Sequence, residues 1–422
     1  MFSRLSTSAR SVLNLHRSSQ FSPSLRASGC RAWSNLTIND TSLVVHSLNA
    51  SFPYIWLRDS CQSLNCIHSS TSQKLHRTSD IPIDIKPIHD GVQLAADGIH
   101  IDWADGHNSF FYTSFLERHS SPQKLAAFHK DIAKAPWDNK GISESRNLFV
   151  PYESLRTEAG LLAAITQIVQ YGLLFVSGVP NKETSDDTCE LPTLAQFFGD
   201  IRPTFYGRIW DVVNVRNSSN IAYTNLDLGL HMDLLYFEHP PRYQILHCLR
   251  NRVHGGTSIF VDAFRAASAL RETHPSEFEV LSTTPVAYHY INDGHHLHRE
   301  HRTIEVTTPT PGSSEGSIDH INYSPPFQAP LPLSTPAAFY PALQRFAKLL
   351  NDPANTYQYT LKEGDAVFFD NRRVLHARTA FSDVEGQGGD GEPSRWLKGC
   401  YLEADDMMDR GRVLTTRLEM SS

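Results

Sequence analysis

The sequence predicts a mainly β protein with flanking helices, built as a double-stranded β-helix (jelly roll) behind a small N-terminal β domain. Short β-prone runs bounded by proline, glycine and polar residues recur along the 422-residue chain, among them 243–249, 366–369 and 395–401. Candidate metal ligands stand at the ends of such runs, and a jelly roll wraps paired sheets around an interior site of this kind. Helical periodicity is confined to a few segments, such as 156–171, which runs into a strand-like stretch at 173–176.

Breaks in composition divide the chain into four segments. Residues 1–35 carry five arginines among ten serines and no acidic residue, which is the composition of a mitochondrial transit peptide. Residues 36–120 are strand-like and predict the small β domain, residues 121–150 form a polar connector, and residues 151–422 form the catalytic domain. We therefore expect a location in the mitochondrial matrix. The cytoplasm is the alternative, if the leader is only a disordered basic tail.

Composition excludes several classes of function. A net charge of -7, without a basic run after the leader, disfavours nucleic acid as a partner. The longest apolar stretch, 160–176, is interrupted by polar residues and predicts no membrane span. Six cysteines without paired spacing do not form a disulfide framework, so a reducing compartment is expected.

Two histidines and one carboxylate form the most informative group of side chains. His231 and Asp233 flank a single residue, and His376 follows 145 positions after His231, inside the run Phe369-Asp-Asn-Arg-Arg-Val-Leu-His-Ala-Arg378. Residues two apart in an extended segment point to the same face, so His231 and Asp233 can hold one ion. Two imidazoles and a carboxylate bind Fe(II) on one face and leave positions open for oxygen chemistry. The sequence therefore predicts a catalytic iron site.

Two other segments fit the same short pattern of a histidine two residues before an acid. Residues 129–131 lie in an amphipathic helical pattern, and residues 298–300 lie in a His-rich polar loop. His231 instead stands at the entrance of a β-prone run, 234–238, so the strand context favours His231 as the ligand.

Several blocks, in order along nearly the whole chain after the leader, resemble the 2-oxoglutarate- and Fe(II)-dependent γ-butyrobetaine and trimethyllysine dioxygenase family, nearest to its fungal-type γ-butyrobetaine enzymes. The resemblance rests on Trp56–Asp59, Trp103–His107, Phe205–Trp210, His231–Leu270 and Phe368–Arg412. It implies the jelly-roll fold, His231, Asp233 and His376 as iron ligands, 2-oxoglutarate as cosubstrate and ascorbate as reductant. It also implies hydroxylation of γ-butyrobetaine to L-carnitine with release of succinate and CO2.

The resemblance places the arginine that binds the distal carboxylate of 2-oxoglutarate at Arg395. Strand alternation puts Arg395 and Tyr401 on one face, with Lys398 facing outward. From the residues alone, Arg378 and Arg373 are equal competitors, because both lie near the metal histidine.

A quaternary ammonium substrate would be held by aromatic faces, because it makes no ordinary hydrogen bond. Aromatic residues taken alone are more often core residues. The resemblance implies a cage for the trimethylammonium group and a polar contact for the rest of the substrate, formed by Tyr206, Trp210, Tyr223, Tyr401 and Asn220. The run 321–328 departs from the family pattern, and Asn322 is a further candidate donor there.

The resemblance also implies a structural zinc in the N-terminal domain, held by Cys61, Cys66 and His107. A closed zinc site takes four ligands. This chain has Ser63 where one branch of the family has a third cysteine, so His68 or His76 would have to complete the site. The alternative is that both cysteines are reduced core thiols.

The expected partners are a small quaternary ammonium substrate, 2-oxoglutarate and O2, and a homodimer is kept as the expected assembly. Trimethyllysine 3-hydroxylation, or hydroxylation of another betaine, is the alternative within the family. Outside it, a non-enzymatic binding protein of the same fold or a zinc hydrolase using the same three ligands would have to be weighed.

Overall fold

The computed structural model describes residues 36–214, 224–308, 315–384 and 393–421. The predicted leader, Asn220 and Tyr223 lie outside these described residues. The chain divides into two compact units, Met1–Phe128 and His129–Ser422.

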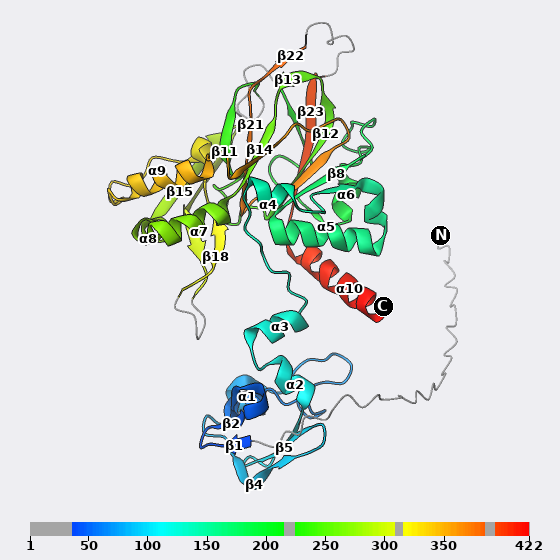
Figure 1. Ribbon diagram of the computed structural model, residues 1–422, viewed down its shortest axis with the longest axis vertical. Helices are drawn as coiled ribbons and strands as arrows, with labels where there is room; N and C mark the ends of the chain where they lie inside the picture. Colours follow the sequence, from blue (N-terminus) through cyan, green and yellow to red (C-terminus); the bar gives the residue numbers. More distant parts are fainter. Residues whose placement is uncertain (1–35, 215–223, 309–314, 385–392, 422) are drawn as a thin grey trace, which may run out of the picture. The chain divides into compact units, whose positions relative to one another are not determined.

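The described part of the first unit, residues 36–128, contains two three-stranded antiparallel sheets and three short α-helices (Figure 1). Alternation along one central strand buries Ile99, Ile101 and Trp103 while His100 faces solvent, which is the pattern of a sheet with one covered face. The sheets are β1 (Leu36–Ile38), β2 (Ser42–Val45) and β3 (Ala50–Pro53), and β4 (Pro87–Leu94), β5 (Gly98–Trp103) and β6 (Asn108–Tyr112); the helices are α1 (Tyr54–Asp59), α2 (Thr113–Arg118) and α3 (Pro122–Phe128).

The second unit is a double-stranded β-helix, as predicted, made of a seven-stranded and a four-stranded sheet. The larger sheet has the order β10 (Trp210–Val213), β23 (Arg395–Leu402), β12 (Tyr243–Asn251), β20 (Ala366–Asp370), β8 (Leu173–Ser177) and β7 (Phe149–Pro151), with β9 (Ile201–Arg202) paired to β23. The smaller sheet has the order β11 (Leu228–His231), β21 (Val374–Arg378), β14 (Ser258–Asp262) and β19 (Thr356–Tyr359). All described pairings are antiparallel except that of β7 with β8.

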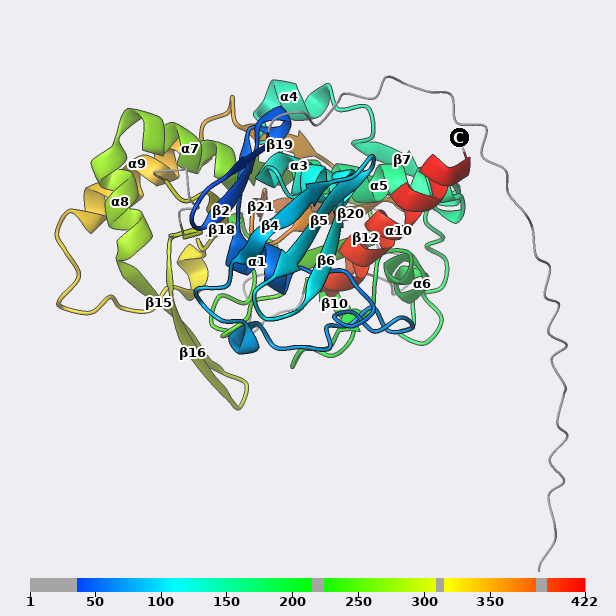
Figure 2. The same cartoon turned by 90° about the horizontal axis from the view of Figure 1, so that it is seen from below.

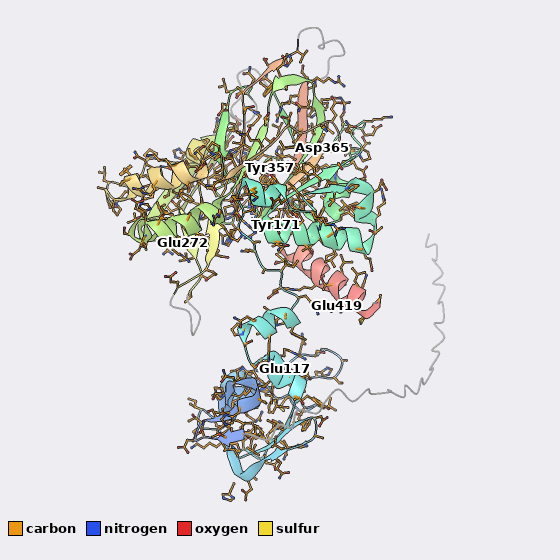
Figure 3. The ribbon with its side chains drawn as sticks, viewed as in Figure 1. Glu117, Tyr171, Glu272, Tyr357, Asp365 and Glu419 are labelled. Carbon is orange, nitrogen blue, oxygen red and sulfur yellow. The ribbon has the colours of Figure 1, made fainter. Side chains whose placement is uncertain are left out.

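Helices cover the sheets in two groups, α5, α6 and α10 at one end and α7, α8 and α9 at the other (Figure 1). Their bounds are α5 (Glu158–Tyr171), α6 (Leu191–Gln196), α7 (Ala263–Thr273), α8 (Pro275–Thr283), α9 (Phe339–Leu350) and α10 (Asp405–Ser421), and α4 (Asn139–Ser143) contacts β19. The α5 helix and the strand after it were both predicted. The Thr157 hydroxyl accepts the Gly160 N–H at the helix start, and Gly172 ends the helix, after Tyr171 (Figure 3), in the left-handed conformation, φ 73°. None of the helices in the described ranges has the length and apolar character needed to cross a bilayer.

Three two-stranded sheets also lie in the described part of this unit: β13 (Val253–Gly255) with β22 (Phe381–Asp383), β15 (Pro285–Asn292) with β16 (His295–Arg302), and β17 (Ile304–Val306) with β18 (Ile318–Ile321). The prediction of a loop around His298 is wrong, because His298 lies in β16. Asp293 and Gly294 both have positive φ and close a two-residue hairpin, which extends beyond the helices of its group (Figure 2). The predicted strand at 234–238 is also wrong, because the chain turns at Leu234, where φ is 63°.

Candidate active site

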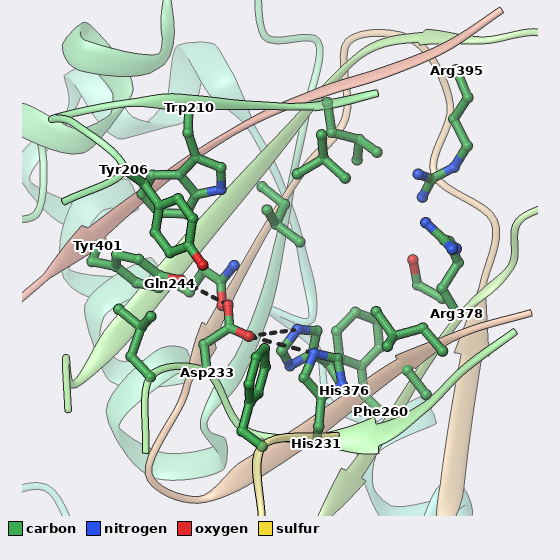
Figure 4. A pocket seen from close by; sticks show the side chains of 18 of the residues that line it. Tyr206, Trp210, His231, Asp233, Gln244, Phe260, His376, Arg378, Arg395 and Tyr401 are labelled. Atoms are coloured by element: carbon green, nitrogen blue, oxygen red, sulfur yellow. Dashed lines mark hydrogen bonds and ion pairs between the residues drawn. The ribbon is translucent and has the colours of Figure 1, made fainter. Parts of the chain in front are cut away.

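The structure brings His231, Asp233 and His376 together. The two histidines face each other in register across β11 and β21, and Asp233 lies two residues beyond the end of β11. Asp233 Oδ1 is 3.4 Å from Nε2 of His231 and 4.0 Å from Nε2 of His376, and the three potential ligand atoms lie within 4.8 Å of one another (Figure 4). This spacing suits side chains that share one ion.

The protonation states fit a divalent metal. Gly229 accepts a hydrogen bond of 2.9 Å from Nδ1 of His231, which leaves Nε2 as the ligand atom. Burial and the neighbouring His231 lower the pKa of His376 to about 3, so its imidazole is neutral, the form that binds metals. Burial raises the pKa of Asp233, but the contacts with both histidines and a tyrosine hydroxyl outweigh this and hold it below the ordinary range. Two imidazoles and a carboxylate are the donor set of an Fe(II) oxygenase site.

Asn371 fixes the backbone that carries Asp233. The Asp233 N–H donates to Asn371 Oδ1 at 2.8 Å, and Asn371 Nδ2 donates to the Asp233 and Pro241 carbonyls at 3.0 and 3.1 Å. Asn371 lies in the run 369–378 that contains His376, but no role was predicted for it from the sequence. A polar amide between a buried strand and a metal histidine is the signal that could have identified it.

Tyr401 contacts the metal carboxylate as well as the aromatic cluster. Its hydroxyl donates to Asp233 Oδ2 at 2.8 Å, and its ring stacks on Trp210 with centroids 4.2 Å apart. Gly399 makes this stacking possible, because a Cβ there would lie 2.6 Å from the indole of Trp210. The family resemblance indicated the aromatic position, but only the structure shows the hydrogen bond.

Three of the four predicted cage aromatics fall within the described residues, and all three line the pocket beside the ligand triad: Tyr206, Trp210 and Tyr401. Tyr236 lines it too and was missed by the sequence reading, which placed it in a strand. Its hydroxyl lies 3.4 Å from that of Tyr206. The structure therefore supplies four described rings on one side of the triad.

Two arginines occupy the other side of the same pocket (Figure 4). Arg395 is 7% exposed and makes no hydrogen bond or ion pair within the described part of the chain, while Arg378 donates to the Thr224 and Leu226 carbonyls. Arg373 does not line the pocket, because it forms a fully buried ion pair of 2.7 Å with Asp262. These contacts favour Arg395 over Arg378 and Arg373 as the arginine whose hydrogen-bond donors are available to a carboxylate in the pocket.

The surroundings of two polar residues, Lys398 and Asn322, differ from those predicted. Lys398 faces away from the pocket, as expected, but it is buried and pairs with Asp186 and Asp211 at 2.5 and 2.8 Å. Asn322 is fully buried, donates to the Arg302 carbonyl at 2.7 Å and does not line the pocket.

The first unit contains the other predicted ligand cluster. The sulfurs of Cys61 and Cys66 lie 3.3 and 3.4 Å from Nε2 of His107. Tetrahedral zinc, with bonds of about 2.3 Å to sulfur and about 2.1 Å to nitrogen, places such atoms about 3.6 Å apart. Neither suggested fourth ligand joins the group: His76 contacts Asp59 at 3.2 Å and His68 contacts Ser70 at 3.3 Å.

In the described ranges, these two clusters are the groups of three or more ligand side chains close enough to share a metal. The pattern at 129–131 is not among them, and its Asp131 pairs with Arg412 at 2.7 Å. The pattern at 298–300 lies exposed on β16.

Comparison with known proteins places these features in a family. The model of the taurine catabolism dioxygenase TauD, TfdA family matches residues 141–401, and that of the gamma-butyrobetaine hydroxylase-like N-terminal domain matches residues 36–116. The chain is 54% identical to dioxygenase str8 of Strobilurus tenacellus, over 88% of this chain and 87% of that protein. It is 31% identical to the mitochondrial trimethyllysine dioxygenase of Gallus gallus, over 86% and 83% of the two chains. It is 29% identical to the gamma-butyrobetaine dioxygenase of Pongo abelii, over 87% and 92%.

Proposed function

We propose that this chain, which belongs to the TauD/TfdA family of 2-oxoglutarate- and Fe(II)-dependent dioxygenases, hydroxylates γ-butyrobetaine to L-carnitine. Family membership sets aside the alternatives of a non-enzymatic binding protein and a zinc hydrolase. One observation carries the choice of substrate class: a cluster of aromatic rings lies beside the ligand triad, in a pocket whose described lining contains one carboxylate, Asp233.

Different residues of the pocket would bind the metal, bind the cosubstrate and position the metal ligands. His231, Asp233 and His376 would hold Fe(II), and Arg395 would bind the distal carboxylate of 2-oxoglutarate through its unengaged, fork-shaped donors. Bound iron and 2-oxoglutarate supply the oxidation of an unactivated C–H bond, with release of succinate and CO2. Asn371 and Tyr401 hold Asp233 in place from its backbone and its free oxygen.

The aromatic side of the pocket supports a trimethylammonium substrate. Tyr206, Trp210, Tyr236 and Tyr401 offer ring faces, and a desolvated cation gains about 2 kcal/mol from such a face. Because Tyr206, Trp210 and Tyr401 lie on the opposite side of the triad from Arg395, substrate and cosubstrate would approach the iron from different directions (Figure 4). This arrangement positions a substrate C–H bond near the metal without competition from the cosubstrate.

The charge of the pocket favours γ-butyrobetaine over trimethyllysine. Trimethyllysine carries an additional α-ammonium group, which needs an acceptor when it is buried. In the described lining, Asp233 is the carboxylate available, and it belongs to the ligand triad. Trimethyllysine remains the second candidate, because relatives named for that activity reach 31% identity over 86% of this chain.

Succinate formation by the purified full chain tests the proposal. The protein would receive Fe(II), 2-oxoglutarate, O2 and ascorbate as reductant, with γ-butyrobetaine, trimethyllysine or the neutral tert-butyl isostere of γ-butyrobetaine. We expect hydroxylation of γ-butyrobetaine, identified by mass spectrometry, and at least about tenfold weaker use of the neutral isostere, since the cation–π attraction is lost. Equal use of the isostere would contradict the cage, and preference for trimethyllysine would replace γ-butyrobetaine as substrate.

Two further assignments accompany this proposal. Cys61, Cys66 and His107 would hold a structural zinc, supported by the short sulfur–nitrogen distances. The arginine- and serine-rich segment 1–35 would direct the protein to mitochondria. Metal analysis of the purified chain and fluorescence imaging with and without residues 1–35 test the two assignments separately.

A further inference from the structure

A second cavity in the catalytic unit contains a buried arginine without a partner. Arg372, on the turn between β20 and β21, is 7% exposed and lines a cavity of about 620 Å³ that shares no lining residue with the pocket of the ligand triad. No carboxylate of the described residues lies within 4.0 Å of its guanidinium, and its Nε is buried without a hydrogen-bond acceptor. A guanidinium taken out of water without a counter-ion is costly, so this arginine calls for an anionic ligand.

Arg242 lies beside Arg372 in the lining of the same cavity. One of its terminal nitrogens donates to Asp370 at 2.7 Å and the other contacts Nε2 of His320 at 3.4 Å, while its Nε is buried and closed to a ligand in the cavity. Burial first, and then the charge of Arg242, lower the pKa of Arg372 to about 10 although nearby carboxylates raise it, so Arg372 is charged at neutral pH. Two guanidiniums therefore line one cavity, and that of Arg372 is the one without an ion pair among the described residues.

Five carboxylates of the described chain line the cavity, and none of them lies within 4.0 Å of the Arg372 guanidinium. Three of them form ion pairs with other arginines, namely Glu238 with Arg299, Glu305 with Arg302 and Glu403 with Arg202. Asp319 contacts His320, which is neutral because burial lowers its pKa to about 4, and Asp405 is exposed in the first turn of α10. Glu305 and Asp319 act on Arg372 from a distance, since both raise its pKa. Arg372 is therefore the arginine of this described lining without an ion pair.

We propose that Arg372 and Arg242 form a binding site for a small oxyanion, a carboxylate or a phosphate, separate from the pocket of the ligand triad. The fork of a guanidinium matches two oxygens of either group. The site flanks Asn371, whose N–H donates to the Arg242 carbonyl at 2.8 Å and whose side chain holds Asp233. An oxyanion bound here would stabilise the segment that supports the metal carboxylate.

Calorimetric titration of the Fe(II)-loaded full chain with phosphate and with acetate, at an ionic strength fixed with chloride, tests the proposal. We expect at least one of these oxyanions to bind to the wild type and to the R395M variant with the same affinity, and the affinity to fall at least about tenfold in R372Q, since charged hydrogen bonds are lost. The better ligand of the two identifies the natural class. R345Q, which removes an exposed arginine whose partner Glu277 lies outside the cavity lining, should change the affinity less than about twofold.

Three results would overturn the proposal: equal binding by R372Q and the wild type, loss of binding in R395M instead, or no binding of either oxyanion above chloride. If R372Q fails to fold, R372K decides the question. R372K keeps the charge but loses the fork-shaped donors, so it should bind the oxyanion several-fold more weakly than the control R345K. Equal binding by these two variants would again overturn the site.

Discussion

The two ligand clusters of this protein have three members each but opposite surroundings. Cys61 and Cys66 lie buried in the first unit together with the half-buried His107. His231, Asp233 and His376 open onto a pocket with aromatic rings on one side and arginines on the other (Figure 4). Structural metal sites are closed, whereas catalytic sites keep positions open for substrate. The surroundings, more than the number of ligands, therefore separate a stabilising site from a reactive one.

The largest expected effect is the loss of turnover when a ligand of the His231, Asp233 and His376 triad is removed. H231A should reduce turnover by roughly a thousandfold or more, because the metal contributes several kcal/mol to the reaction. Circular dichroism should show that the fold is retained, and the zinc content should be that of the wild type. Turnover close to that of the wild type would show that the triad is not the iron site.

Removing a thiol should give the reverse result. C66S is expected to lose zinc and to destabilise the first unit by several kcal/mol, because binding of a structural metal contributes directly to folding. Iron binding should change little, which calorimetry with Fe(II) under anaerobic conditions can check. C189S is the matched control, since Cys189 is also a buried free thiol but lies outside the cluster. Equal effects of the two substitutions would favour plain core thiols.

Acid should destabilise the catalytic unit through a histidine that has no part in either cluster. Burial lowers the pKa of His247 to about 4, from about 6.5 when unfolded, so the unfolded chain binds its proton more readily. Stability should be full above pH 6.5 and fall as the pH drops toward 4, by at most about 3 kcal/mol for this residue. Denaturant unfolding of wild type and H247Q over this range checks the slope, which should be shallower in the variant.

The cosubstrate side of the pocket should respond to loss of Arg395. R395M is expected to raise KM for 2-oxoglutarate roughly a hundredfold, because removing a charge-assisted pair costs about 2 to 3 kcal/mol. R395K should recover only part of this loss, since it restores the charge without the fork. An unchanged KM in R395M would transfer the role to Arg378.

The smallest expected effect concerns how Asp233 is held. Y401F keeps the ring that stacks on Trp210 but removes the hydroxyl that donates to Asp233. Iron affinity should fall about tenfold, as it does when groups that orient metal ligands are removed, while KM for the substrate changes little. If KM rises and iron affinity does not, Tyr401 acts only as a cage residue.

The sequence alone was sufficient for the features that depend on local pattern. Alternating apolar runs predicted strands such as β8, β12, β20 and β23, and the spacing of His231 and Asp233 predicted a pair of ligands from one segment. The prediction failed where local pattern and tertiary packing disagree. The run after Asp233 is β-prone, yet it turns at Leu234, next to the Asp233 backbone that Asn371, 138 residues away in the chain, binds.

Only the tertiary structure decided which of the candidate groups meet. The β11–β21 register places His231 opposite His376. The buried ion pair with Asp262 makes Arg373 unavailable to bind 2-oxoglutarate. Strand β23 brings the hydroxyl of Tyr401 to Oδ2 of Asp233. For the same reason, Tyr236 lies beside the predicted cage residues, and Arg372 lies without an ion pair among the described residues. Residue types and spacing determine what chemistry a chain can perform, but contacts between distant segments depend on strand register and burial, which local sequence does not encode.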